Sequence, residues 1–253
     1  MATLTTKSDW TTWLTRWHRQ QEHYLHDRPR RFAIMLDYVQ DLRGSGPLAL
    51  MDLCCGPGSI TSMALSRFDS TVTAVDIDPW LVEMGRRTLG DDPRVCWLEA
   101  DVRADGWAQS LPSAGYDAVL SSTALHWLHR DELVRVFDEL ARLVAPGGVF
   151  LNADHLPVGH GRIATIAHDR KQAESSRKLA APGAESWEQY WEAARAEPAF
   201  VALLAERERR FANRRRAAPV PVEFHREALL AAGFTEVGEI WRDHDDAVLL
   251  AIR

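Results

Sequence analysis

The chain has 253 residues, of which 46% are hydrophobic, and this composition predicts a globular domain of ordinary size. A net charge of −6 argues against a general nucleic-acid binder. There is no run of about 18 apolar residues that could span a membrane, and residues 1–7 lack the apolar core of a signal peptide. Three cysteines, two of them adjacent, predict neither a disulfide framework nor a metal site. We therefore expect a cytoplasmic protein.

The N-terminal segment has the spacing of two amphipathic helices over residues 8–42. Trp10, Trp13 and Trp17 recur at intervals of three and four residues, which places them on one helix face. Pro29 marks a break before the second apolar face. Ten tryptophans in the chain indicate that aromatic side chains line a lid or pocket as well as the core.

Apolar runs alternate with helical segments between residues 47 and 154. This alternation is typical of a parallel sheet with helices on both faces. The expected strands are 47–54, 71–77, 94–99, 116–121 and 147–154. After a long interruption, a helix at 222–232 and strands at 235–241 and 247–252 return to the sheet.

The interruption is a basic, helical segment. Residues 160–216 contain no strand-like run and predict two or three polar helices, with breaks near Pro182 and Pro198. Twelve Lys and Arg face eight Asp and Glu between 156 and 220, and the main contributors are Arg207, Arg209, Arg210, Arg214, Arg215 and Arg216. This surplus could attract an anionic partner, but a solvated helix face explains it more simply, and we favour that interpretation.

A glycine-rich turn follows the first expected strand, in the run Leu-Met-Asp-Leu-Cys-Cys-Gly-Pro-Gly-Ser-Ile-Thr over residues 50–61. Gly56 and Gly58 let the backbone approach a ligand closely, and the next helix directs its free N–H groups to the same place. Asp76 ends the second strand, where a carboxylate suits the two hydroxyls of a ribose. The third glycine of a dinucleotide fingerprint and the lysine of a phosphate loop are both absent. The pattern predicts a nucleoside site.

These residues resemble the Asp-x-Gly-x-Gly-x-Gly loop of class I S-adenosylmethionine-dependent methyltransferases. Cys54 stands where that family usually has glycine, which is the one departure in the loop. Further matches follow in the family's order: an acid at Asp76, another at Asp101, and a Pro-Gly-Gly turn at 146–148. The resemblance is close over residues 45–155 and returns weakly over 222–253.

The resemblance implies an α/β fold of the Rossmann-like type: a seven-stranded, mostly parallel sheet with an antiparallel last strand, a helical N-terminal segment and a helical cap insertion. The expected division is a lid over 1–44, the core that binds S-adenosyl-L-methionine over 45–155, the cap over 156–220, and the end of the core over 221–253.

The resemblance also implies which residues contact this cofactor. The methionine part would lie on Asp52, Cys54, Gly56 and Gly58, with Ser121 closing its floor. Asp76 and Ile77 would hold the ribose, and Asp101 and Val102 the adenine. Tyr24 and Arg31, ahead of Arg28, are the candidates for the cofactor carboxylate, because arginine binds carboxylates in bidentate fashion.

Two histidines are candidates for a catalytic role. Methyl transfer is an in-line displacement, and an O–H or N–H acceptor also needs a base. His126 follows the fourth strand by five residues, and His155 follows the fifth strand directly. The structural alternatives are that His126 caps or packs the start of the next helix with Trp127 and that His155 is a loop histidine before Pro157. His160 and His168, in the cap, have weaker claims.

Absent motifs narrow the substrate. Residues 121–124 are Ser-Ser-Thr-Ala rather than the Asn/Asp-Pro-Pro-Tyr/Phe of nucleobase amine methyltransferases, and there is no evident glutamate pair or aspartate-rich metal site. We expect a small-molecule acceptor, with an anionic one left open by the basic cap, and no nucleic-acid or membrane partner. The alternatives are an RNA methyltransferase and an enzyme that uses the cofactor without methyl transfer, for instance by cyclising it.

Overall fold

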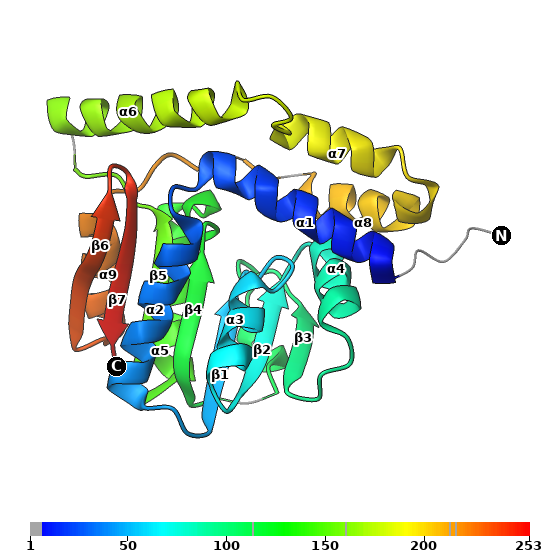
Figure 1. Cartoon of the computed structure of the whole chain (residues 1–253). Coiled ribbons are helices and arrows are strands. Elements are labelled where there is room, and N and C mark those ends of the chain that lie inside the picture. Colours follow the sequence, from blue (N-terminus) through cyan, green and yellow to red (C-terminus); the bar gives the residue numbers. More distant parts are fainter. Residues whose placement is uncertain (1–6, 113, 160, 213, 216) are drawn as a thin grey trace.

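A computed structural model describes residues 7–112, 114–159, 161–212, 214–215 and 217–253. In this part of the chain one sheet of seven strands runs in the order β3-β2-β1-β4-β5-β7-β6 (Figure 1). The strands are β1 (Leu48–Leu53), β2 (Ser70–Asp76), β3 (Val95–Glu99), β4 (Tyr116–Ser122), β5 (Val144–His155), β6 (Glu236–Asp243) and β7 (Asp246–Ile252).

The strand directions are those of the expected fold. Neighbouring strands from β3 through β5 pair in parallel, and β7 is antiparallel to both β5 and β6. The seven-stranded, Rossmann-like architecture with one antiparallel strand is confirmed. His160 and Arg216 lie outside the described residues, as do residues 1–6.

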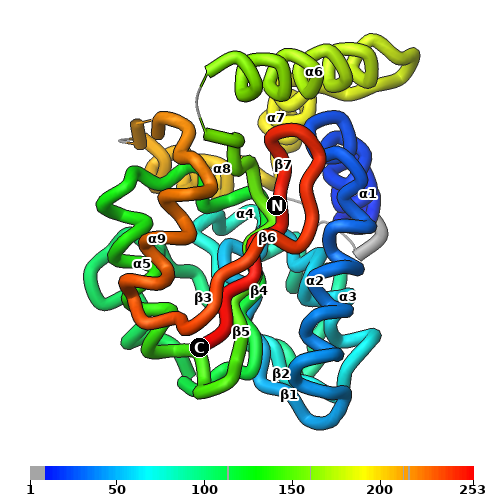
Figure 2. The backbone as a smooth tube through the Cα atoms, turned by 90° about the vertical axis from the view of Figure 1, so that its left-hand side faces the viewer, coloured from blue at the N-terminus to red at the C-terminus, as the bar shows by residue number. Residues whose placement is uncertain are grey.

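Helices cover both faces of the sheet (Figure 2). On one face α2 (Arg28–Arg43) and α3 (Ser59–Arg67) bury apolar side chains against the strands. On the other face α5 (Arg130–Leu143) and α9 (Val222–Ala232) do the same, beside the short 3-10 turns η1 (Trp107–Ser110) and η2 (Leu125–Trp127). Because the inner strands bury both of their faces, they carry apolar runs such as that of β5, whereas the edge strands β3 and β6 are partly exposed.

The remaining helices form a roof over the carboxyl ends of the parallel strands (Figure 1). They are α1 (Lys7–Tyr24), α6 (Arg162–Leu179), α7 (Trp187–Arg195), the 3-10 turn η3 (Pro198–Phe200) and α8 (Val201–Phe211), and α4 (Pro79–Leu89) supports them from below. The helices expected on both sides of the core are therefore present. Within the described residues, no helix combines the length and apolar character needed to cross a bilayer.

An aromatic cluster joins the N-terminal helix to the cap. Trp80 on α4 is fully buried, and Trp13 on α1 meets its ring edge-on at 5.9 Å between centroids. Tyr190 on α7 and Phe200 on η3 contact the same two tryptophans at 5.4–5.8 Å. Such edge-to-face pairs add about 1 kcal/mol each to the burial of the rings. The tryptophans of α1 thus form a hydrophobic core within the lid. Through it, α1, α4 and α7 pack together as one unit.

Candidate functional site

The glycine loop connects β1 to α3 and is tied to the end of β2. Gly56 and Gly58 have φ values of 54° and 76°, in the left-handed region that favours glycine. The Cys55 N–H donates to the carbonyl of Val75, and the Gly56 N–H donates to Oδ2 of Asp76 at 2.7 Å. These bonds hold the loop against the strand that carries the predicted ribose ligand.

Gly58 has a packing role that the sequence analysis did not assign to it. A Cβ at this position would lie 2.5 Å from the ring of Trp97 on β3, and a Cβ on Gly85 of α4 would lie 2.3 Å from the same ring. Trp97 therefore fills the space between the glycine loop and α4. The second glycine of the loop is required by this close approach and by its positive φ.

Cys54 occupies a strained backbone position. Its φ is 57°, although it is not a glycine, and it is half-buried at the end of β1. A left-handed conformation costs a residue with a side chain about 1–2 kcal/mol. The resembled loops usually have glycine at this position. Cys54 therefore replaces the residue that fits this turn best.

Replacing Cys54 by glycine is expected to raise the free energy of unfolding by about 0.5–1 kcal/mol, because glycine relieves the strain but gains freedom in the unfolded chain. Urea denaturation monitored by circular dichroism measures the change. Cys54→Ala is the matched control, since it removes the thiol and keeps the strain. Equal stabilisation by alanine would show that the thiol, and not the backbone, is unfavourable.

Asp76 lies at the end of β2 with both carboxylate oxygens engaged. Besides the bond from Gly56, its Oδ1 accepts the Asp78 N–H at 2.8 Å. Burial, together with the nearby charge of Asp78, raises the pKa of Asp76 to about 6, against the opposing effect of these N–H donors. The buried carboxylate is therefore close to its titration range at neutral pH.

Asp52 supports the loop from beneath. Its Oδ2 accepts the backbone N–H and the hydroxyl of Thr61, at 2.9 and 2.7 Å, and so anchors the first turn of α3. Burial raises the pKa of Asp52 to about 7, although the two bonds from Thr61 lower it. Ser121, at the end of β4, is also buried and pairs in register with Leu53, which places it beside the loop as expected.

Asp101 follows β3 and is surrounded by arginines. Arg103 donates to both of its oxygens, from Nε at 3.1 Å and from Nη2 at 2.9 Å. Arg214, from the segment after α8, approaches Oδ2 at 3.4 Å. Val102 next to it is buried. Asp101 follows β3 directly, its arginine partners were not foreseen, and its contact with adenine stays a prediction.

The arginines of α8 correct the interpretation of the cap as a solvated face. Arg207 binds Asp78 at 2.6 Å with its guanidinium 3.8 Å above the ring of Trp191. Arg210 donates to the carbonyl of Ile77 and to Glu99, both at 2.9 Å. These side chains point inward and hold α8 to the ends of β2 and β3. Among its neighbours, Arg209 is 72% exposed and fits the original interpretation.

His126 forms a dyad with a buried carboxylate. Its Nδ1 lies 2.6 Å from Oδ1 of Asp154 on β5, and its backbone N–H donates to Oδ2 at 3.1 Å. Asp154 is fully buried, yet the charge and hydrogen bond of His126 hold the pKa of this carboxyl well below its usual range. The Asp154 carboxylate engages Nδ1 and orients the ring, so Nε2 is the ring nitrogen left to face an acceptor. His126 does not cap α5, whose N-cap residue is His129.

His155 forms a second dyad beside the first. Its Nδ1 lies 2.5 Å from Oδ1 of Asp246 on β7, and its ring centroid is 4.8 Å from that of His126. Lys171, from α6, contacts the same oxygen of Asp246 and the His155 ring. Burial lowers the pKa of His155, and the neighbouring Lys171 adds to this effect, so the ring is neutral.

Helix α6 covers this corner through polar contacts. Among its described residues only Ala167 is buried. It is attached to the β6–β7 hairpin by Lys171 and by His168, which lies 3.2 Å from Asp245, and to the α1–α2 turn by Glu174, which lies 2.5 Å from His26. His168 therefore helps to attach the cap to the hairpin, and we do not assign it the role of a base.

Three N-terminal candidates diverge in the structure. The Tyr24 hydroxyl accepts the backbone N–H of Trp187, so it connects α1 to the cap. Arg28 lies against the start of α3, where it donates to Ser59 at 2.8 Å. Arg31 is fully buried, its Nη1 is 3.6 Å from Oδ2 of Asp246, and none of its three nitrogen atoms has a hydrogen-bond partner among the described residues. Of the three, Arg31 is the buried one whose N–H groups lack hydrogen-bond acceptors, although Asp246 lies within ion-pair distance.

Sequence reasoning missed the groups that orient the histidines: Asp154, Asp246 and Lys171. Asp154 could have been noticed, because it lies one residue before the end of β5, and acids at the carboxyl ends of parallel strands meet at one edge of the sheet. Asp246 and Lys171 reach the site only through the β6–β7 hairpin and the cap, so their spacing carries no local signal.

Comparison with known proteins identifies methyltransferases as the proteins similar to this chain. A family model described as a methyltransferase domain matches residues 50–148. An uncharacterized methyltransferase of Mycobacterium tuberculosis is 36% identical over 123 residues, which cover 48% of this chain and 58% of that protein. The trans-aconitate 2-methyltransferase of Azoarcus sp. is 32% identical over 134 residues, covering 53% of this chain and 48% of that protein. The chain thus spans about half the length of these relatives.

Among solved structures, the CurJ carbon methyltransferase superposes with a TM-score of 0.56 over 88% of this chain and 53% of that chain. The sequence identity is 16%, so this likeness concerns the fold.

Proposed function

We propose that this chain, whose residues 50–148 belong to the class I S-adenosylmethionine-dependent methyltransferase family, transfers a methyl group to an oxygen or nitrogen atom of a small molecule. The observation that carries this proposal is the His126–Asp154 dyad, which presents a free imidazole nitrogen at the carboxyl ends of β4 and β5. A positioned base has no purpose unless the acceptor carries a proton.

The residues present fit S-adenosyl-L-methionine. A buried guanidinium without hydrogen-bond acceptors, Arg31, suits the carboxylate of the methionine part. Asp76 would accept hydrogen bonds from the ribose, and its bond from the Gly56 N–H supports this by holding the loop against β2. Asp101 would serve the adenine, with Arg103 holding its carboxylate in place.

The cofactor supplies a methyl group activated by a sulfonium. This chain's residues supply alignment, water exclusion and proton transfer. The roof of α1, α6, α7 and α8 covers the strand ends and would exclude water. His126 would accept the acceptor's proton at Nε2, and Asp154 would stabilise the imidazolium that forms. His155, neutral and 4.8 Å away, is placed to accept a hydrogen bond from the acceptor.

A carboxylate acceptor is the second candidate. Lys171 and Arg31 flank Asp246 at the same corner, and one of the similar curated proteins is named for methylation of trans-aconitate, a carboxylic acid. A carboxylate needs orientation by cations but no base, since it is ionised at neutral pH. The two candidates therefore differ in whether His126 is required.

Calorimetric titration with S-adenosylhomocysteine tests the cofactor assignment, and micromolar binding is expected. Methyl transfer from methyl-labelled S-adenosylmethionine to a panel of phenols, amines and carboxylic acids then tests the acceptor class. Consumption of the cofactor in the absence of any acceptor would favour a non-methylating enzyme. Absence of binding by a folded protein would overturn the proposal.

A further inference from the structure

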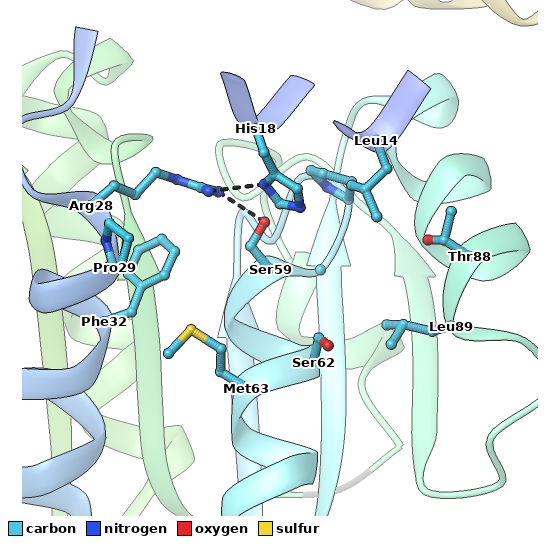
Figure 3. Close-up of a pocket in the computed structure, with 12 residues that line it drawn as sticks. Leu14, His18, Arg28, Pro29, Phe32, Ser59, Ser62, Met63, Thr88 and Leu89 are labelled. Carbon is cyan, nitrogen blue, oxygen red and sulfur yellow. Dashed lines mark hydrogen bonds between the residues drawn. The ribbon is translucent and has the colours of Figure 1, made fainter. Parts of the chain in front are cut away.

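A cavity of about 350 Å³ lies on the outer side of the glycine loop, bounded by α1, α2, α3 and α4 (Figure 3). Two residues considered for the cofactor border it, Gly58 of the glycine loop and Arg28, for which we prefer Arg31 as the partner of the cofactor carboxylate. The lining residues are Leu14, His18, Arg28, Pro29, Phe32, Pro57, Gly58, Ser59, Ser62, Met63, Thr88 and Leu89. The volume is within the range of small-molecule sites in proteins, roughly 300–1,000 Å³.

Arg28 gives the cavity a positive wall without a matching acid. Its Nη1 donates to Nδ1 of His18 at 3.0 Å and its Nη2 to the hydroxyl of Ser59 at 2.8 Å. Burial lowers the pKa of His18 to about 4, with Arg28 adding to the effect, so this partner is neutral. No carboxylate forms an ion pair with the half-buried Arg28 in the described parts of the chain, although the charges of Glu22 and Asp52 act on it from further away.

Partial burial of the Arg28 guanidinium costs free energy, which a bound anion would offset. Burial, followed by the nearby charge of Arg31, lowers the pKa of Arg28 to about 10, which still leaves it protonated at neutral pH. A guanidinium has five N–H donors, and the two bonds to His18 and Ser59 leave three for a ligand. A carboxylate is the group whose shape matches such a fork.

The rest of the cavity is mainly apolar. Leu14 points into it from α1, Leu89 reaches across from α4, and Met63 approaches Phe32 on the other side (Figure 3). The hydroxyls of Ser62 and Thr88 are the further polar groups of the lining. A ligand that fits has one anionic end and a short hydrocarbon body.

We propose that this cavity is a second small-molecule site, distinct from the methyl-transfer site, which binds an amphipathic monocarboxylate with its carboxylate on Arg28 and its chain between Leu14, Met63 and Leu89. The proposal stands apart from the methyltransferase assignment, because it uses the helices around the glycine loop and requires neither cofactor nor acceptor.

Octanoate is the probe, titrated into the full chain by calorimetry, with 1-octanol as the neutral ligand of equal length. Octanoate is expected to bind saturably. Arg28→Gln should weaken octanoate at least tenfold, about the value of one charge-assisted hydrogen bond, and leave 1-octanol unchanged. Thermal unfolding of each variant establishes that it is folded.

Two further variants locate the site. Met63→Trp fills the cavity without touching the charge and is expected to abolish octanoate binding. Lys171→Gln alters the cationic corner beside His155 and should leave octanoate binding as in the wild type. The proposal is overturned if octanoate does not bind saturably, if the Arg28 variant binds it equally well, or if Met63→Trp has no effect.

Discussion

Replacement of His126 by asparagine is expected to lower the rate constant for methyl transfer by about 100-fold or more, with the affinity for S-adenosylhomocysteine unchanged. Nε2 of His126 is the ring nitrogen left to take the acceptor's proton, because Nδ1 is engaged by Asp154 at 2.6 Å. Asparagine keeps a similar size and a hydrogen-bonding group but cannot accept a proton at neutral pH.

Asp154→Asn tests the same arrangement from the other side. An amide still accepts a hydrogen bond, but it no longer stabilises an imidazolium, so a loss of rate is expected with His126 intact. The effects of the two substitutions should not add, since both disable one unit. His168→Gln, on the polar attachment of α6, is the matched control that removes a nearby histidine outside the dyad.

Single-turnover kinetics with a phenol or amine acceptor separates chemistry from binding. Full activity of His126→Asn with such an acceptor would remove the base from the mechanism. Activity retained only with carboxylic acids would instead favour the carboxylate acceptor, which Lys171 would orient.

The strands and helices were predictable because their signals are local. The run from Val149 to Asp154 is mostly apolar and predicts a buried strand. The turn at Gly56 predicts that the first strand ends just before it. The structure lengthens β5 at its start to Val144, and the pairing with β4 is irregular across the Pro-Gly-Gly turn, where Gly147 has a φ of 73°. The antiparallel hairpin at the end came from the resemblance and not from periodicity.

The partners of the site residues were not predictable, because they come from segments distant in the sequence. His155 and Asp246 are 91 positions apart and meet through the pairing of β5 with β7. Arg207 reaches Asp78 from 129 positions away. The sequence pattern of α8 alone could not show that this face is turned inward. Arginine occurs both on helix faces in contact with the protein and on solvated ones. Only packing of the cap against α4 decides the direction.

Replacement of Asp76 by alanine is expected to weaken binding of S-adenosylhomocysteine at least tenfold, about 1.4 kcal/mol, because it removes a charged acceptor for the ribose hydroxyls. The loop also loses its bond from the Gly56 N–H to this carboxylate. Calorimetric titration of the folded variant measures the change. Unchanged affinity would contradict the ribose assignment.

The pH dependence of the wild type gives an independent test. Burial raises the pKa of Asp76 to about 6 from the ordinary 3.8, so the carboxylate is protonated below that pH in the ligand-free protein. Because the ionised form is the better acceptor, affinity should fall as pH decreases from 7 to 5. The stability of the ligand-free protein should change in the opposite sense, since a raised pKa means that folding favours the protonated form and stability is lost as pH rises through 6.

Asp76→Asn separates this group from Asp52, whose pKa is raised to about 7 by burial and which titrates in the same range. The asparagine variant should bind S-adenosylhomocysteine more weakly at pH 7 and show a flatter pH dependence between 5 and 7. A variant that keeps the full wild-type slope would assign the titration to Asp52, acting through Thr61 and the first turn of α3. In that case the glycine loop, and not the ribose acid, would set how cofactor affinity depends on pH.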